Sequence, residues 1–303
     1  MPTPAPNRRE FLQAAAATAC VSMLPLQATA AASPTRRPWK WAPEPGLWET
    51  VCGDDVTAQL HAAADAGFTA FADPDILQRS KRQRDEFRAG AQQRAMRIGP
   101  FRGPTSGYRS FTELATTFEI AAGCGVSGSR AEVLAWQMNP NDFPAKRADV
   151  VKQIQSFTER AAFAWRERFS TEMIPVHWEP QTHLPADRPL WEIFAETIHE
   201  ANHPLCRLSV DTYRLASAGI DVVSYMQRHT AIIGHVELAD YPGGFEPGSG
   251  TLDIAGIVAA TALSPHDGVI GLRCGLSQPR QAGLDRLIAA ARHHHGLRDN
   301  MWT

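Results

Sequence analysis

The sequence predicts a single-domain α/β protein, a (β/α)8 TIM barrel, and three observations support this fold class. Strand-like and helix-like segments alternate from about residue 39 to the C-terminal end. Four strand-like runs in the second half each carry a charged residue near their C-terminal end, about one β-α unit apart: Glu179, Asp211, Glu237 and Arg273. The rival fold, an open doubly wound sheet, would need a glycine-rich phosphate-binding turn after an early strand, and the sequence has none.

Eight strands are expected, and their pattern is clearest in the last four. They lie near residues 39–44, 68–73, 97–101, 131–137, 172–179, 205–211, 232–239 and 268–274. Successive side chains of a strand face opposite sides. In the fifth strand, for example, Val176 and Trp178 form an apolar face, whereas His177 and Glu179 share the other. This pattern is typical of a barrel wall with helices outside and a polar mouth at the strand ends.

Eight helical runs fill the intervals and complete the β-α units. They are expected near residues 54–67, 76–95, 111–123, 146–168, 189–202, 212–229, 252–263 and 278–294. The run from Val56 to Ala66 has the apolar spacing of an amphipathic helix, with Leu60 and Ala63 on one side. Gly67 is placed to cap this helix, and Phe68 begins the next strand.

The N-terminal segment 1–32 is predicted to be a twin-arginine signal peptide. Arg8 and Arg9 are followed by Phe-Leu and by a weakly apolar, alanine-rich stretch, and Ala28-Thr29-Ala30 offers an A-x-A cleavage site. The alternatives are an ordinary secretory signal or a membrane anchor, but the apolar run is too short and too polar for a span of about 20 residues. We therefore expect the twin-arginine export machinery as a partner, a periplasmic or secreted location and no stable membrane anchor.

The mature chain is expected to have a short linker at 33–38 and the barrel at 39–303. The formal net charge is −2, which does not indicate a basic face for nucleic acid. Four cysteines of the mature chain stand singly, without a metal-ligand spacing, so free thiols and disulfides both stay open; they are Cys52, Cys124, Cys206 and Cys274. Cys206 and Cys274 lie in apolar strands, which favours buried free thiols there.

The segment from His235 to Gly250, HVELADYPGGFEPGSG, resembles the hydroxypyruvate isomerase family of the xylose-isomerase-like barrels, which are grouped with sugar isomerases and epimerases. The family pattern there is roughly H-I-Q-I-A-D-x-P-G-R-H-E-P-G-T-G-E. Glu179-Pro180 is similar to the family's E-P strand end, and Asp211-Thr212-Tyr213 to its D-x-Y. Gly271-Leu272-Arg273 stands where the family has G-L-E, and the order agrees over about residues 170 to 275.

The resemblance implies a metal-assisted proton transfer between adjacent carbons of a sugar or hydroxy-carbonyl compound. Such barrels commonly bind one divalent metal, here Mn, Mg, Zn or Co, through carboxylates at the mouth. It implies Glu179, Asp211 and Glu237 as the metal ligands, with Glu237 where the family has Gln. Glu179 or Glu246 would then carry the proton, while the metal stabilises the enediolate.

The eighth-strand glutamate of the family is missing, since Arg273 occupies its place. A guanidinium is neither a metal ligand nor a general base near neutral pH. We expect Arg273 to reach into the mouth and pair with Glu237, so that Glu237 is either its partner or a metal ligand. The family's Arg and His in the seventh-strand loop are here Gly244 and Phe245, which indicates a different substrate.

Two functions from different classes follow. The first is an exported isomerase or epimerase for a small sugar or hydroxy-carbonyl substrate. The second is a barrel that has lost this chemistry and binds a sugar acid or sugar phosphate through Arg273. His183, His235 and Arg273 are the expected substrate-binding residues, although His235 is also typical of a packed, hydrogen-bonded histidine. Barrels of this group often pair, which makes a homodimer one expectation of the resemblance.

Overall fold

The computed structural model describes residues 40–102, 116–117, 119–120, 123–124, 129–132, 143–166, 176–179, 188–266 and 269–294. The expected signal peptide at 1–32, the linker at 33–38 and His183 lie outside these residues, as does most of the helix expected at 111–123. Among the helices of the described ranges, none is long and apolar enough to cross a membrane.

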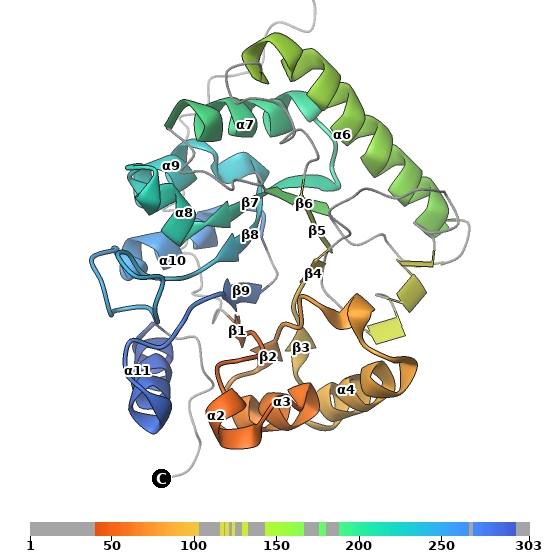
Figure 1. Ribbon diagram of the computed structural model, residues 1–303. Coiled ribbons are helices and arrows are strands. Elements are labelled where there is room, and N and C mark those ends of the chain that lie inside the picture. The colour runs from red at the N-terminus through yellow and green to blue at the C-terminus, as the bar shows by residue number, and fades with distance from the viewer. Residues whose placement is uncertain are drawn as a thin grey trace, which may run out of the picture. The chain divides into compact units, whose positions relative to one another are not determined.

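The strands form a ring of parallel neighbours (Figure 1). They are β1 (Lys40–Pro43), β2 (Ala70–Phe71), β3 (Arg97–Ile98), β4 (Phe101–Arg102), β5 (Ser129–Glu132), β6 (Val176–Glu179), β7 (Cys206–Asp211), β8 (Ile233–Glu237) and β9 (Val269–Leu272). One sheet has the order β1-β9-β8-β7-β6-β5-β4, and β2 pairs with β3. β3 and β4 are successive parts of the third expected strand, and a backbone hydrogen bond of 3.0 Å from Ala72 to Pro43 joins the ends of β2 and β1. The eight strand positions of a TIM barrel are therefore present.

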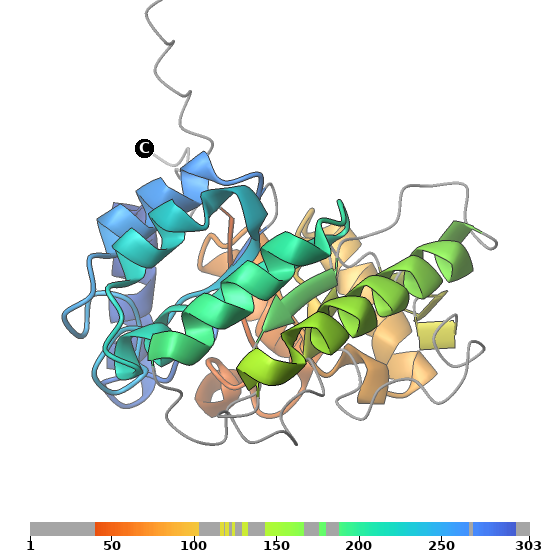
Figure 2. The same cartoon turned by 90° about the horizontal axis from the view of Figure 1, so that it is seen from above.

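The helices follow the strands and lie outside the ring (Figure 1). They are α2 (Glu49–Cys52), α3 (Val56–Asp65), α4 (Lys81–Gln93), α6 (Phe143–Arg166), α7 (Arg188–Ala201), α8 (Thr212–Ser217), α9 (Val222–Arg228), α10 (Ile254–Leu263) and α11 (Arg280–His293), with 3-10 turns η1 (Ile76–Gln78) and η4 (Thr230–Ile232). In Figure 2 α6 runs beside α7, where Arg147 bonds Glu196 and Glu200.

Two expected helices are divided in the structure. The helix expected at 212–229 is split into α8 and α9, because Gly219 has a positive φ of 71° and the Asp221 side chain caps a new helix through the Ser224 N–H. The helix expected at 76–95 begins as the turn η1, and α4 starts only after Ser80. Ser80 and Gln83 form a capping box there, and this local motif starts α4 as a separate helix. The expected strand positions are otherwise confirmed, although β5 begins two residues earlier than expected.

Both faces of the second-half strands are buried, but with different contents. The apolar face packs into the main core with residues such as Trp178, Leu208 and Val236. The opposite, inward face carries buried polar side chains: His177, Glu179, Ser209, Asp211, His235 and Glu237. Because buried charges and imidazoles are costly unless they are paired, this polar interior marks the barrel axis as the place for a site.

Candidate active site

Four charged residues lie at one edge of the barrel because their strands are parallel and end at the same level. Glu179, Asp211 and Glu237 are the last residues of β6, β7 and β8, and Arg273 follows β9 directly. The register pairs Asp211 with Glu237 and Glu237 with Gly271. The C-terminal strand ends are where TIM-barrel enzymes build their active sites, so the expected residues are brought to the expected place.

Arg273 is the centre of the charge arrangement. Its Nη1 lies 3.9 Å from Oε1 of Glu179 and 3.9 Å from Oδ2 of Asp211. The Glu179 side chain is 1% exposed, whereas that of Arg273 is 30% exposed. The guanidinium thus lies between the carboxylates of β6 and β7, and the pairing with Glu237 that we expected stays a prediction. The seven heavy atoms of an arginine side chain allow it to cross from β9 to these strands.

Asp211 has a structural task in addition to its place in the site. Its Oδ1 accepts a hydrogen bond of 2.9 Å from the backbone N–H of Arg214 and so caps α8. The Arg214 Nε lies 3.5 Å from Oδ2 of the same carboxylate. Burial raises the pKa of Asp211 above its usual value and the nearby Glu179 adds to this rise, while the bond from Arg214 and the charges of Arg214 and Arg273 oppose it.

Glu237 is turned down toward the barrel interior. Its Oε1 lies 2.7 Å from Nε2 of His235, and both side chains are almost completely buried. A Cβ at position 271 would lie 2.7 Å from Oε2 of Glu237, so Gly271 makes room for this carboxylate. The His177 ring stacks on His235 at a centroid distance of 5.4 Å. This burial favours a positioning role for His235 over the substrate contact that we expected from the sequence.

The arrangement does not fit the divalent metal that the resemblance implies. Within the described ranges, no group of three or more His, Cys, Asp or Glu side chains is arranged to hold a metal ion. An ion shared by Glu179 and Asp211 would lie close to the Arg273 guanidinium, and at a separation of about 4 Å a dication is repelled by about 8 kcal/mol at an effective dielectric constant near 20. The two carboxylates already face a cation that belongs to the chain.

Glu246, an expected proton carrier, lies in a different environment. Its two carboxylate oxygens accept hydrogen bonds from the backbone N–H and the hydroxyl of Ser277, at 2.6 and 2.5 Å. The Nε of Arg286 lies 3.1 Å away, and the Glu246 side chain is 1% exposed. These bonds tie the loop after β8 to the segment before α11, which favours a structural role. The other expected residue of this kind, His183, lies outside the described residues.

Several polar groups at the strand ends were not singled out from the sequence. The Arg79 guanidinium binds both carboxylate oxygens of Asp73, which follows β2. Asp240, three residues after β8, is completely buried and accepts hydrogen bonds from four backbone N–H groups. Glu132 pairs in register with Glu179 on the neighbouring strand. The sequence could have indicated these acidic residues, because each one ends or closely follows a strand.

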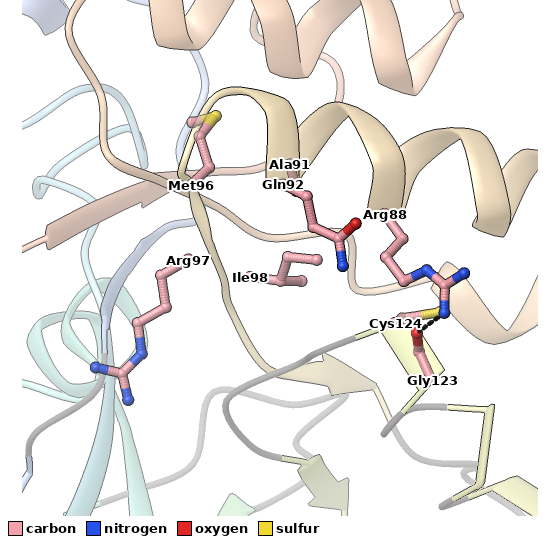
Figure 3. Close-up of a pocket in the computed structure, with 8 residues that line it drawn as sticks. All are labelled: Arg88, Ala91, Gln92, Met96, Arg97, Ile98, Gly123 and Cys124. Atoms are coloured by element: carbon pink, nitrogen blue, oxygen red, sulfur yellow. Dashed lines mark hydrogen bonds between the residues drawn. The ribbon is translucent and has the colours of Figure 1, made fainter.

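A hollow of about 360 Å3 lies elsewhere on the protein (Figure 3). It is lined by Arg88, Ala91, Gln92, Met96, Arg97, Ile98, Gly123 and Cys124. These residues surround the end of α4 and the start of β3, the opposite end of the barrel from the charged residues. In Figure 3 Arg97 points away from the other residues, and Arg88 donates to the Gly123 carbonyl. Burial raises the pKa of Cys124, so this thiol is a poor nucleophile. The mouth remains the better candidate.

Comparison with known proteins confirms the fold and the resemblance. No protein-family model matches the chain. It is 35% identical over 63 residues to a Streptomyces coelicolor protein described as "Putative hydroxypyruvate isomerase", and the match spans 21% of this chain and 23% of that protein. The chain therefore matches less than a quarter of that relative's length.

Similar folds are found in solved structures of several activities. An AP endonuclease of family 2 from Brucella melitensis has a TM-score of 0.64 at 15% identity, over 83% of this chain and 98% of that one. A 3-keto-D-glucoside 4-epimerase from E. coli has a TM-score of 0.64 at 15% identity, over 84% and 98%. A D-psicose 3-epimerase from Clostridium cellulolyticum has a TM-score of 0.65 at 13% identity, over 85% and 99%. These likenesses establish the TIM-barrel fold.

Proposed function

We propose that this protein is an isomerase or epimerase of a small carbohydrate or hydroxy-carbonyl compound, with Glu179 as the proton carrier and Arg273 as its electrostatic partner. The observation that carries the proposal is the position of the Arg273 Nη1, 3.9 Å from the carboxylates of both Glu179 and Asp211 at the barrel mouth. The curated relative and two of the three similar structures described above are isomerases or epimerases by description, which supports this reaction class.

Glu179 would move the proton. A carboxylate can remove a proton from the carbon next to a carbonyl group, and the electron pair of the broken C–H bond then moves onto the carbonyl oxygen as an enediolate. Return of this proton to the former carbonyl carbon, together with transfer of the proton of the adjacent hydroxyl group to the enediolate oxygen, completes an aldose–ketose type isomerisation. One carboxylate on one face of the substrate is sufficient for this transfer, whereas inversion at a carbon needs proton carriers on both faces.

Arg273 would stabilise the enediolate. Its Nη1 is buried and has no hydrogen-bond partner among the described residues, so it can donate to a developing oxyanion. A guanidinium held beside two buried carboxylates is already positioned and needs little rearrangement during the reaction. In this proposal Arg273 takes over the electrostatic task that a metal has in related barrels, and no step passes through a metal ion.

The same available donor supports a second candidate, the binding of a sugar acid or sugar phosphate without turnover. A planar guanidinium is well suited to carboxylates and phosphates. The two candidates differ in the need for Glu179. A catalytic carboxylate is essential for turnover, while a binding site for an anion is expected to retain or improve its affinity when a neighbouring negative charge is removed.

The deciding experiment uses the purified mature protein, the Glu179→Gln variant and Arg273→Ala, each with a panel of aldoses, ketoses and hydroxypyruvate. We expect turnover by the wild type in EDTA and a loss of roughly a thousandfold in Glu179→Gln, with circular dichroism unchanged. Turnover at the wild-type rate in Glu179→Gln would contradict the proposal. Binding of gluconate or glucose 6-phosphate without any turnover, abolished in Arg273→Ala, would favour the second candidate.

We also propose that the protein is exported through the twin-arginine route, because Arg8 and Arg9 precede Phe-Leu and an alanine-rich segment. The full chain with both arginines changed to lysine should stay in the cytoplasmic fraction. A chain that reaches the periplasm despite both changes would contradict this route.

A further inference from the structure

The loop after β8 exposes two aromatic side chains next to the charged residues of the mouth. Tyr241 is 37% exposed and Phe245 is 38% exposed. The Tyr213 ring, at the start of α8, lies 6.1 Å from that of Tyr241 between ring centroids. We call Tyr213, Tyr241 and Phe245 the aromatic rim. Exposed aromatic side chains that gather at one place contribute little to folding, which points to a binding role.

The backbone holds this loop in one conformation. The buried carboxylate of Asp240 accepts hydrogen bonds from the N–H groups of Tyr241, Gly248, Gly250 and Leu252, at 2.8 to 3.0 Å. Asp240 N and Phe245 O are 2.9 Å apart, and Gly275 N bonds Gly244 O at 2.8 Å. A loop fixed by this many bonds presents its side chains with little loss of conformational entropy on binding.

Close backbone approaches place the rim at the mouth. A Cβ at Gly275, two residues beyond Arg273, would lie 3.2 Å from the Phe245 ring. On the other side, a Cβ at Gly244 would lie 3.7 Å from the Tyr213 ring, and Tyr213 is two residues beyond Asp211. The rim therefore extends from the end of β7 to the end of β9, across the strand ends that carry Asp211 and Arg273.

We infer that the aromatic rim binds the apolar face of a hexopyranose ring, so that the substrate of the proposed reaction is a disaccharide or glycoside that also carries a free carbonyl group, rather than a free triose. The axial C–H groups of a β-glucopyranose form a flat apolar face that packs on aromatic rings, while its equatorial hydroxyls suit the tyrosine hydroxyls. The Tyr213 and Tyr241 rings are inclined by 42°, so they do not form the parallel slot that a planar nucleobase needs. The binding of the sugar ring is inferred from the aromatic rim itself. Only the carbonyl chemistry of the substrate rests on the proposed function.

The test measures binding of methyl β-D-glucopyranoside and cellobiose by calorimetry and saturation-transfer NMR, with the mature protein in its Glu179→Gln form to prevent turnover. We expect saturation transfer to the ring C–H protons and a loss of affinity of roughly tenfold in Phe245→Ala. Phe163→Ala is the matched control, since Phe163 is an exposed phenylalanine on α6. Phe245→Leu keeps most of the apolar volume without the aromatic face and should also weaken binding.

The outcomes separate this inference from the proposed function. The sugar-binding role of the aromatic rim would be contradicted by either of two results. One is no binding of either saccharide at millimolar concentrations, and the other is equal affinity in Phe245→Ala, Phe245→Leu and the Glu179→Gln protein from which they are made. Phe245-dependent binding, without turnover of cellobiose or of any panel sugar by the wild type, would support the sugar-binding role of the aromatic rim and contradict the isomerase proposal. Turnover of hydroxypyruvate with no saccharide binding would support the isomerase proposal and contradict the sugar-binding role of the aromatic rim.

Discussion

The guanidinium of Arg273 bridges Glu179 and Asp211, with its Nη1 3.9 Å from a carboxylate oxygen of each. Neither contact is short enough for a direct hydrogen bond, so the relationship is one of charge within a largely buried site. One cation between two acids reduces their mutual repulsion, and its buried Nη1 keeps a hydrogen-bond donor without a partner among the described residues. This relationship makes the site chemically distinct from a carboxylate set that holds a metal.

Removal of this cation should have a larger effect on turnover than on folding. We expect Arg273→Ala to reduce kcat by roughly a hundredfold, because the enediolate loses its stabilising charge. Stability should fall by only about 1–2 kcal/mol, since Arg273 is partly exposed and its contacts are long. Urea unfolding and initial rates check both values. Arg273→Lys is the control and should recover part of the activity, whereas full activity in Arg273→Ala would exclude this role.

Reversal of the charge should create a metal site. Arg273→Glu restores the acidic residue that the resembled family has at this position, and it removes the repulsion of about 8 kcal/mol between guanidinium and dication. We therefore expect the variant to bind Mn²⁺ far more tightly than the wild type in calorimetry. Inductively coupled plasma mass spectrometry of both proteins, with the segment His293–His295 altered, gives the metal content as purified. Equal metal content and affinity would show that Arg273 does not control metal binding.

Glu246 and Glu179 should respond differently to the same substitution. Glu246→Gln keeps the shape of the side chain but loses the charge that faces Ser277 and Arg286. We expect a loss of about 1–2 kcal/mol in stability, with kcat within about threefold of wild type. Glu179→Gln should show the opposite result, with nearly normal stability and turnover reduced by roughly a thousandfold. A loss of activity in Glu246→Gln without a loss of stability would support the role of proton carrier that the sequence predicted for Glu246.

Asp240 should be the most sensitive position of the loop. Asp240→Ala removes a buried carboxylate that accepts hydrogen bonds from four backbone N–H groups of the loop, and we expect a loss of about 3–5 kcal/mol in unfolding free energy. Asp221→Ala is the control, because it removes only an exposed helix cap and should cost about 1 kcal/mol. Chemical denaturation measures both. Similar losses in the two variants would mean that the loop is not organised by Asp240.

Cys206 should be unreactive in the folded protein. It is a free, buried thiol, and burial raises its pKa to about 12. At pH 8 the reactive thiolate is therefore scarce, and its labelling by iodoacetamide should be slower than in the unfolded chain by a factor of at least about a thousand. The half-buried Cys52 provides the internal comparison. Mass spectrometry of labelled peptides measures both rates, and equal rates would show that the strand opens readily.

The strands and the level of the charged residues could be predicted from the sequence because both depend on local alternation. The sixth expected strand, at 205–211, is β7 at Cys206–Asp211. Glu179, Asp211 and Glu237 end their strands as expected, since parallel strands of a barrel share one C-terminal edge. Helix division was harder to predict, because the cap at Asp221 competes with a continuous apolar pattern over 212–229.

The sequence by itself determined the barrel, the mouth and the identity of the charges there, because side-chain periodicity specifies face and level along a strand. Only the tertiary structure decided which charges meet. The long side chain of Arg273 crosses to Glu179 and Asp211, and Glu237 turns to His235. It also decided that Glu246 binds Ser277 and that Phe245 lies over Gly275. These contacts join segments far apart in the chain, and their geometry depends on the closed ring rather than on local pattern.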